Sequence, residues 1–290
     1  MARYIQAKTI LSTVKHKPDP YFGLSYNMNL YRGCQHGCIY CDSRSKCYQL
    51  GELSDIRVKE NAINMLECEL RSKRTIGTIG FGSMNDCYMP VEKEYQLTRK
   101  ALEVIKRYHY PIHIITKSNL VVRDIDLLRE INKVYAAVSF TITSEDDNLC
   151  KTIEPCAPTT SERFEAMSKL SSEGIYCGVT LMPVLPFIND TVENVVSIVE
   201  KAKAAGAKYI LAVFGLTLRE GNREYFYDAL DKLFPGIRAR YEKVFGMQYN
   251  CSSPNSSELY KTFNRLCNEA GIATKMEFYK PAQIVELKLF

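Results

Sequence analysis

Short apolar runs alternate with longer amphipathic segments along most of the chain, and the alternation repeats six times. Each run is rich in Val, Ile, Thr, Tyr or Phe, and several are nearly continuous, which is typical of strands buried on both faces. Six strand-then-helix units predict a parallel sheet with right-handed crossovers. The predicted strands are Ser25–Tyr31, Ile76–Gly82, Pro111–Lys117, Val134–Ile142, Tyr176–Leu185 and Lys208–Gly215.

The amphipathic segments between these runs predict helices, and two of them are followed by the stop signals Gly174 and Gly206. Beyond the six units, the pattern predicts a further helix at Ser256–Glu269 and short strand-like pieces at Thr274–Phe278 and Ile284–Leu289. The helices within the units are predicted at Val58–Leu70, Glu92–Tyr108, Asp124–Asn132, Ser161–Glu173, Thr191–Ala205 and Glu224–Leu233.

Two architectures fit six such units: a doubly wound open sheet and a barrel that closes only in part. A complete (β/α)₈ barrel needs eight units, so it is not expected unless the C-terminal segment supplies more strands. No low-complexity linker or repeat of fixed period divides the chain. In either architecture the loops that follow the strands converge at one end of the sheet, so we expect the chemistry there.

Composition narrows the class of protein. The chain has 290 residues and a net charge of +5, and a nucleic-acid binder that relied on bulk charge alone would be more basic. The chain has 11 cysteines, an odd number, and it is long enough to form a stable core without disulfide bonds. Both features favour a reducing, cytoplasmic compartment. The first residues lack an unbroken apolar stretch, and no segment is long and apolar enough to span a membrane.

The strongest local signal is a group of three cysteines, Cys34, Cys38 and Cys41, directly after the first predicted strand. Glycines between them let the backbone curl around a bound group, and thiolates suit zinc or an iron–sulfur cluster. A structural zinc site needs a fourth ligand, and the nearest candidates, His36 and Cys47, are not at the usual pairing distance. Three thiolates on a four-iron cluster would instead leave one iron open for a substrate or cosubstrate.

The Cys-x₃-Cys-x₂-Cys spacing at this position resembles the signature of the radical S-adenosylmethionine (radical SAM) enzymes, and Tyr40 occupies an aromatic position that this family favours. Further segments, spread over nearly the whole chain, resemble the spore photoproduct lyase-like branch, which is described as related to DNA-repair photolyases. The matching segments are Asn29–Cys34, Asn85–Pro90 with Glu92, Thr116–Ser118 with Arg123 and Asp124, Ile153–Pro155 with Arg163, Met182–Pro186 with Asn189 and Asp190, and Thr217–Arg219.

This resemblance implies an α/β fold, namely a partial (β/α)₆ TIM-like barrel of the radical SAM type with a short C-terminal extension. We therefore expect an N-terminal extension at residues 1–24, the barrel at 25–235, and a C-terminal extension at 236–290 that packs on the barrel.

The resemblance also implies two cofactors, a [4Fe–4S] cluster and S-adenosylmethionine (SAM), with the cluster held by Cys34, Cys38 and Cys41. Polar groups at the ends of the next strands would hold SAM: acceptors for its ammonium after the second strand, and a cation for its carboxylate after the third. A plain Asx turn and a solvated lysine are the alternative interpretations. The residues implied in cofactor binding, besides the cysteines and Tyr40, are Asn85, Asp86, Lys117, Ser118, Ser139 and Arg163.

Two residues are candidates for a catalytic role. Arg219 follows the sixth strand and would contact substrate or SAM, unless it belongs to a surface ion-pair cluster. In the lyase branch a cysteine and a tyrosine relay a hydrogen atom, but the matching positions here are Ser83 and Asp42. A serine O–H bond is too strong for that role, so Cys87 could replace the donor if its loop turns inward, and a half-buried small residue is the alternative.

The function that the resemblance implies is reductive cleavage of SAM to a 5′-deoxyadenosyl radical that acts on a nucleic-acid base or another substrate in a lyase-like reaction. The alternatives are a radical SAM enzyme that modifies a peptide or small molecule, and a non-catalytic zinc-binding protein. A radical SAM enzyme would need a one-electron reductant such as flavodoxin or ferredoxin, and we expect no membrane association.

Overall fold

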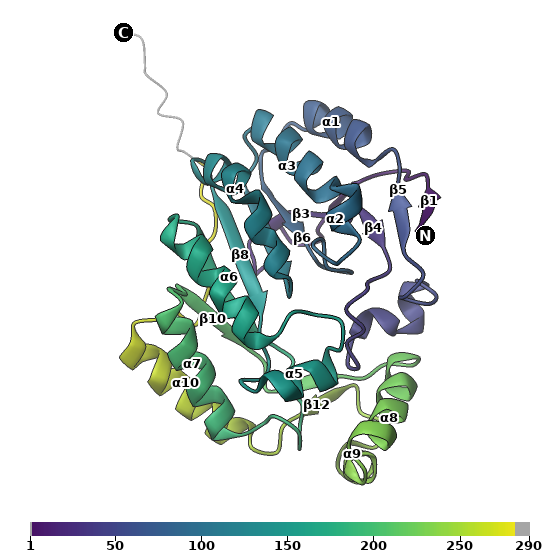
Figure 1. Cartoon of the computed structure of the whole chain (residues 1–290), viewed down its shortest axis with the longest axis vertical. Helices are drawn as coiled ribbons and strands as arrows, with labels where there is room; N and C mark the ends of the chain where they lie inside the picture. The colour runs from purple at the N-terminus through teal and green to yellow at the C-terminus, as the bar shows by residue number, and fades with distance from the viewer. Residues whose placement is uncertain (1, 282–290) are drawn as a thin grey trace.

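The computed structural model describes residues 2–281, and its centre is a seven-stranded sheet (Figure 1). Six of the strands run parallel and follow one another in sequence order, which confirms the α/β class and the open, partial barrel. The seventh strand, β2 (Leu11–Thr13), pairs antiparallel with the first of them. The parallel strands are β3 (Leu24–Met28), β6 (Thr78–Phe81), β7 (Ile112–Thr116), β8 (Ala136–Thr141), β9 (Tyr176–Leu181) and β10 (Tyr209–Ala212).

Helices follow these strands, and their local sequences account for where they begin and end. In α6 the side chain of Thr159 accepts from the Glu162 amide while Glu162 accepts from the Thr159 amide, a capping box that starts the helix. Gly174 and Gly206 end two helices with positive φ angles, as predicted. The helices of the repeated units are α1 (Ala62–Ser72), α3 (Leu97–Arg107), α4 (Ile125–Asn132), α6 (Thr160–Ser172), α7 (Val192–Ala204) and α8 (Asn222–Leu233).

The sheet is buried between these helices and the barrel interior, as the continuous apolar runs predict. Every residue of β6 and β8 is buried. Gly178 in β9 allows this packing, because a Cβ atom there would lie 2.4 Å from the Tyr209 ring. Inside the barrel, His113 and Tyr209 both contact the Ser139 hydroxyl, at 2.7 and 2.6 Å. Strands with this much buried apolar surface form the rigid frame that positions the loops.

Two small sheets lie beside the main one, and the sequence pattern did not predict either. The first joins β1 (Arg3–Ile5), β5 (Arg57–Lys59) and β4 (Tyr31–Arg32) in the order β1-β5-β4. The second pairs β11 (Gly215–Thr217) with β12 (Asn250–Ser252). Strands of two or three residues are too short to give a recognisable period, so only tertiary pairing reveals them.

Several predicted boundaries were wrong. The helix predicted at Val58–Leu70 begins only at Ala62, because Val58 belongs to β5. The helix predicted at Glu92–Tyr108 is interrupted at Gln96, whose left-handed backbone separates α2 (Glu92–Tyr95) from α3.

The C-terminal segment also differs from the prediction. Helix α10 (Ser256–Ala270) is present, but Thr274–Phe278 forms no strand, and only Ala273 makes an isolated bridge, to Tyr209. The piece predicted at Ile284–Leu289 lies outside the described residues. Apolar residues of α10 join the core of the barrel, while the domain boundaries at residues 24 and 235 stay a prediction. The short helices that the pattern missed are α5 (Asp147–Ile153), α9 (Ile237–Phe245), and the 3₁₀ turns η1 (Asp42–Arg44), η2 (Lys46–Tyr48) and η3 (Asn119–Asp124).

No helix within residues 2–281 is both long enough and apolar enough to cross a membrane.

Candidate active site

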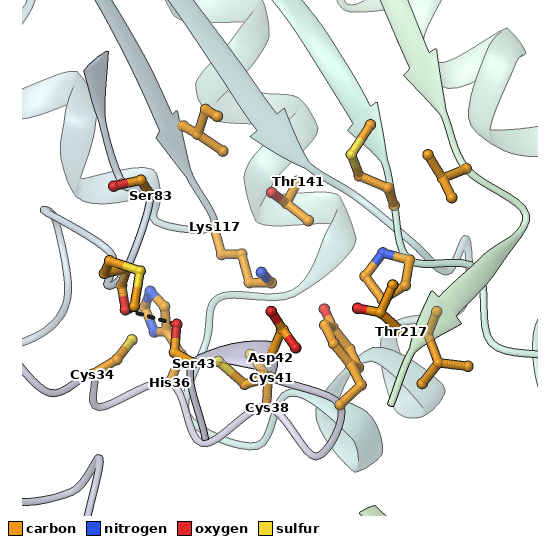
Figure 2. Close-up of a pocket in the computed structure, with 18 of the residues that line it drawn as sticks. Cys34, His36, Cys38, Cys41, Asp42, Ser43, Ser83, Lys117, Thr141 and Thr217 are labelled. Atoms are coloured by element: carbon orange, nitrogen blue, oxygen red, sulfur yellow. Dashed lines mark hydrogen bonds between the residues drawn. The ribbon is translucent and has the colours of Figure 1, made fainter. Parts of the chain in front are cut away.

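A cavity of about 600 Å³ lies where the parallel strands end, between the cysteine loop and the β11–β12 pair (Figure 2). Its walls come from the loops after β6, β7, β8 and β9, which is where a parallel α/β fold places its chemistry. This volume falls in the range of small-molecule and cofactor sites. The lining residues used below are Cys34, His36, Cys38, Tyr40, Cys41, Asp42, Tyr48, Ser83, Asn85, Asp86, Thr116, Lys117, Thr141, Thr217, Asn250 and Ser252.

Cys34, Cys38 and Cys41 all line this cavity, from one curled loop. The loop turns at Gly33 and Gly37, whose φ angles are +90° and +70°, values that favour glycine. Burial, and after it the nearby Asp86, raises the pKa of the Cys34 thiol to about 11, and burial raises the pKa of Cys38 well above its usual range. The protein by itself therefore favours neutral thiols at Cys34 and Cys38, whereas a bound metal would take them as thiolates.

The loop is held by backbone hydrogen bonds to two distant segments. The Cys34 amide donates to Leu53 O at 2.8 Å, and the Ile39 amide donates to Ile153 O at 3.0 Å. The Cys156 amide in turn donates to the carbonyl of His36 at 3.1 Å. These bonds tie the cysteine loop to the segments around Leu53 and Ile153.

The donor set distinguishes zinc from an iron–sulfur cluster. Within residues 2–281 no three His, Cys, Asp or Glu side chains converge on a position for a single metal ion. Cys47, the candidate fourth zinc ligand, is exposed and lies outside the cavity lining, with its sulfur 3.4 Å from Arg219 Nη1. A four-iron cluster is ligated at separate corners, so its three thiolates need to line a common cavity without meeting at one point. The three cysteines and the cavity in front of them fit such a cluster.

Asp86 connects the cysteine loop to the ends of β6 and β7. Its Oδ1 accepts from Thr116 Oγ1 at 2.7 Å, and its Oδ2 accepts from the Lys117 amide at 2.7 Å and lies 3.0 Å from His36 Nε2. Burial by itself would raise the pKa of this carboxyl, but His36 and the donors outweigh burial and lower the pKa to about 2. Both carboxylate oxygens are thus already occupied by protein groups.

The neighbouring Asn85 is the freer of the two acceptors predicted at this turn. Its amide Nδ2 donates to the Tyr31 carbonyl at 2.7 Å, which fixes the side chain. Among the hydrogen bonds within residues 2–281, none uses Asn85 Oδ1, and the residue lines the cavity.

Lys117 reaches into the cavity from the end of β7 (Figure 2). Its Nζ lies 5.7 Å from the centroid of the Tyr40 ring. Burial by itself would lower the pKa of Lys117, but Cys38 and Glu154 outweigh it, and the pKa is raised. A cation therefore faces the cavity beside the thiols.

Behind Tyr40 lies a fully buried ion pair that the sequence interpretation did not identify. Glu154 accepts from the Tyr40 hydroxyl and pairs with Arg163, and both charged side chains are completely buried. Arg163 also donates to Thr141 O at 2.8 Å. The resemblance of the Ile153–Pro155 segment to the family is the one signal that could have identified Glu154.

The remaining predicted site residues lie outside the cavity lining. Ser118 caps η3, accepting from the Leu120 amide at 3.2 Å. Ser139 and Arg163 are buried in the networks described above, and Arg163 is linked to the cavity through Thr141 and through Glu154 and Tyr40. Cys87 packs in the main core, and burial raises its pKa well above the usual range. The structure therefore does not bring these four side chains to the cavity.

Arg219 lies at the edge of the cavity rather than inside it. Its guanidinium lies 4.9 Å from the Tyr249 ring centroid and 5.5 Å from that of Tyr48, and it donates to the Tyr249 hydroxyl at 2.7 Å. Tyr48 lines the cavity. We refer to Tyr48, Arg219 and Tyr249 as the aromatic rim. Sequence reasoning missed its two tyrosines, because the chain has 19 tyrosines and only the fold brings these to Arg219.

The far wall of the cavity is polar and comes from the β11–β12 pair. It includes Thr217, Asn250 and Ser252, which come from two segments more than 30 positions apart in the chain and were not predicted. Ser83 and Asp42, which replace the relay residues of the lyase branch, also line the cavity (Figure 2).

Comparison with known proteins agrees with this geometry. Residues 28–196 match the model of the radical SAM superfamily. An uncharacterised protein of Methanocaldococcus jannaschii is 35% identical over 171 residues, which cover 58% of this chain and 63% of that protein. An uncharacterised protein of Mycobacterium tuberculosis is 31% identical over 228 residues, covering 76% of this chain and 67% of that protein.

A likeness of fold extends over almost the whole chain. The structure of spore photoproduct lyase complexed with dinucleoside spore photoproduct superposes with a TM-score of 0.68 at 16% identity, covering 93% of this chain and 80% of that one. A radical SAM Nalpha-GlyT isomerase of Pseudomonas phage M6 is 24% identical over 82% of this chain and 50% of that protein. The family model covers more than half of the chain, including the cysteine loop and strands β6 to β9, so the chain belongs to the radical SAM superfamily.

Proposed function

We propose that this protein is a radical SAM enzyme in which Cys34, Cys38 and Cys41 hold a [4Fe–4S] cluster. The observation that carries the proposal is that all three thiols line one wall of a cavity of about 600 Å³ whose other walls present polar and cationic groups. A cluster held by these three thiols would supply one electron for the reductive cleavage of the sulfonium of SAM, with methionine and a 5′-deoxyadenosyl radical as products. The protein supplies binding, orientation and exclusion of water.

Three side chains are placed to orient SAM. Asn85 Oδ1 is an acceptor for its ammonium, and the Lys117 ammonium is a partner for its carboxylate. Asp86 acts by positioning, because its oxygens fix His36, Thr116 and the Lys117 amide. Glu154 and Arg163 likewise act through Tyr40, which they hold beside Lys117.

The aromatic rim supports a nucleic-acid base as the substrate. Rings next to a guanidinium offer stacking surfaces, and stacking of a base on an aromatic side chain contributes about 1–3 kcal/mol. A second pair of the same kind joins η1 to α8, where the Arg44 guanidinium is 3.6 Å from the Tyr225 ring centroid. With Ser83 and Asp42 in the cavity, the hydrogen-atom relay of the lyase branch is not reproduced, so we propose a base-directed radical reaction other than thymine-dimer repair.

Anaerobic reconstitution tests this function. Purified protein is treated with iron and sulfide, reduced with dithionite and given SAM, and 5′-deoxyadenosine is measured. We expect cluster absorbance and 5′-deoxyadenosine from the wild type and neither from a Cys38→Ala variant. Cys47→Ala is the matched control, because this thiol lies outside the cavity lining, and it should keep both signals. Stoichiometric zinc with no cluster and no SAM cleavage would overturn the proposal.

A further inference from the structure

The three-stranded sheet β1-β5-β4 lies at one side of the molecule (Figure 1). Its strands carry a row of cations. Arg3 of β1 and Arg32 of β4 are both register partners of Arg57 in β5, so the three arginines lie side by side across the sheet. Lys59 is two residues beyond Arg57 and projects from the same face of the strand. Arg32, Arg57 and Lys59 are each only half-buried, and we call these three residues the cationic face.

Little negative charge balances this face. Arg3 has a dedicated partner in Asp55, whose carboxylate also lies 3.6 Å from Arg57 Nε. Apart from this pair of Arg57 with Asp55, the three cations of the face donate hydrogen bonds to neutral main-chain carbonyls, those of Gln49, Leu50 and Asn29. Like charges placed directly across two strands destabilise a sheet. A partner that brings negative charge would therefore reduce the repulsion between these side chains.

Glu69, a further carboxylate that acts on Lys59, does not neutralise the face. Glu69 attracts Lys59, but its oxygens accept from the Thr9 hydroxyl and from the amides of Ile10 and Leu11. Burial, and after it the charge of Arg32, lowers the pKa of Lys59.

The cationic face lies directly behind the cysteine loop. Arg32 precedes Cys34 by two residues, so their Cα atoms are at most about 7.6 Å apart. The segment between the face and the loop is tightly packed, since a Cβ atom on Gly33 would lie 2.7 Å from Leu53 O and 2.8 Å from Asp55 O. None of the three cations lines the cavity. The face therefore lies next to the cysteine loop in the chain and outside the cavity lining.

We propose that the cationic face docks an acidic one-electron carrier protein that reduces the cluster. This rests on the proposed function, which requires one electron per SAM cleaved. In the docked complex the carrier is oxidised by one electron and the cluster is reduced by one, and no bond or proton is transferred. Docking behind Cys34 leaves the mouth free for SAM and substrate. A nucleic acid would instead need its phosphates held near the mouth, where the aromatic rim lies.

Stopped-flow reduction of the reconstituted protein tests the proposal, with a reduced flavodoxin of net negative charge and with dithionite as two separate reductants. The variants are Arg57→Gln and Lys59→Gln, because Gln keeps a side-chain donor for the carbonyl while it removes the charge. Lys261→Gln is the control, since Lys261 is exposed on α10, at the opposite side of the molecule (Figure 1).

We expect each variant to slow flavodoxin-dependent reduction by on the order of tenfold at low salt and to flatten its salt dependence, while dithionite reduces all proteins equally. An unchanged flavodoxin rate, or an equal loss in Lys261→Gln, would overturn the docking face alone. Loss of oligonucleotide binding in the two variants with an unchanged flavodoxin rate would assign the face to nucleic acid and also overturn the proposal. A wild type with no cluster reducible by dithionite would overturn the proposed function itself.

Discussion

Asp86 ties together the residues that surround the predicted SAM position. The sequence placed a carboxylate after the second strand of the barrel, and from that place it was expected to accept hydrogen bonds from a ligand. In the folded chain its oxygens instead face His36, Thr116 and the Lys117 amide. Position in the sequence predicts which residue types surround a site, whereas the hydrogen bonds that a buried carboxylate forms depend on which loops meet.

Lys117 is the residue whose charge we expect SAM binding to need most. Replacing it with Gln removes a cation that faces the cavity, and a hydrogen bond to a charged partner contributes about 1.5–3 kcal/mol. We therefore expect Lys117→Gln to weaken SAM binding by on the order of 10- to 100-fold in equilibrium dialysis, with the cluster retained. Lys203→Gln, on the exposed side of α7, should bind like the wild type. Equal affinities for both variants would contradict this role.

His113 makes the stability of the fold depend on pH. Burial lowers the pKa of its imidazole from 6.5 to about 3, so between these values the unfolded chain binds a proton that the folded chain does not. Stability must then rise with pH over this window. The wild type should lose about 2 kcal/mol of unfolding free energy through this group between pH 7.5 and pH 5, measured by urea denaturation.

In the His113→Gln variant, the unfolding free energy should fall by about 2 kcal/mol less than in the wild type between pH 7.5 and pH 5. The control is His16→Gln, because His16 is exposed and should leave the wild-type slope in place. A His113→Gln variant with the full wild-type slope would show that other groups cause the pH dependence.

Among the structural elements, the cysteine loop depends on both neighbouring loops. Its three ligands and its glycines were evident in the sequence because they lie within one short segment. The partners that shape it, Leu53 and Ile153, come from two other segments of the chain. Both hydrogen bonds end on backbone carbonyls, which every residue carries, so the sequence does not reveal these two contacts.

A substitution at Gly33 tests whether iron loading requires the observed conformation of the cysteine loop. With φ at +90° and two carbonyl oxygens within 2.8 Å of the position that a Cβ atom would take, Gly33→Ala must displace either the loop or the Leu53–Asp55 segment. We expect this variant to fold but to take up less than half of the wild-type iron on reconstitution. Gly51→Ala is matched for backbone conformation, with φ at +69° and nothing within 4 Å, and should load normally. Equal loading of both variants would show that the loop adapts.

The same reasoning explains which predicted residues did not reach the cavity. Cys87 and Ser118 follow strand ends, where sequence position alone suggests a role. The turn after β6 points Cys87 into the core, and Ser118 caps the next 3₁₀ turn. A shift of one residue in a turn changes the direction in which a side chain points. The hydrophobic period of the neighbouring strands and helices does not predict this direction.

Across the whole molecule, the cavity is a joint product of the barrel and the C-terminal part of the chain. The parallel strands provide the cysteine side and the cationic side, and the β11–β12 pair provides the polar wall. The aromatic rim bridges them, because Tyr48 follows the cysteine loop while Arg219 and Tyr249 flank the β11–β12 pair. Substrate choice is therefore expected to depend on both parts.

A binding measurement tests the rim as a base-stacking surface. We expect the wild type to bind a single-stranded oligonucleotide at low salt, with affinity that falls steeply as salt rises. Arg219→Gln should weaken this binding by roughly three- to tenfold, whereas Arg265→Gln, at an exposed arginine paired with Glu269 on α10, should have no effect. No binding by the wild type at low salt would exclude a nucleic-acid substrate and favour a peptide or a small molecule.

The sequence alone determined the six-unit parallel fold, the family and the three cysteines, because each is encoded locally, in a hydrophobic period or in a spacing of a few residues. The tertiary structure decided what depends on segments far apart in the chain. It buried Glu154 against Arg163, turned Cys87 away, formed the polar wall, and aligned Arg3, Arg57 and Arg32 across three short strands. Contacts of this kind arise only when the whole core has packed, since no single segment contains both partners.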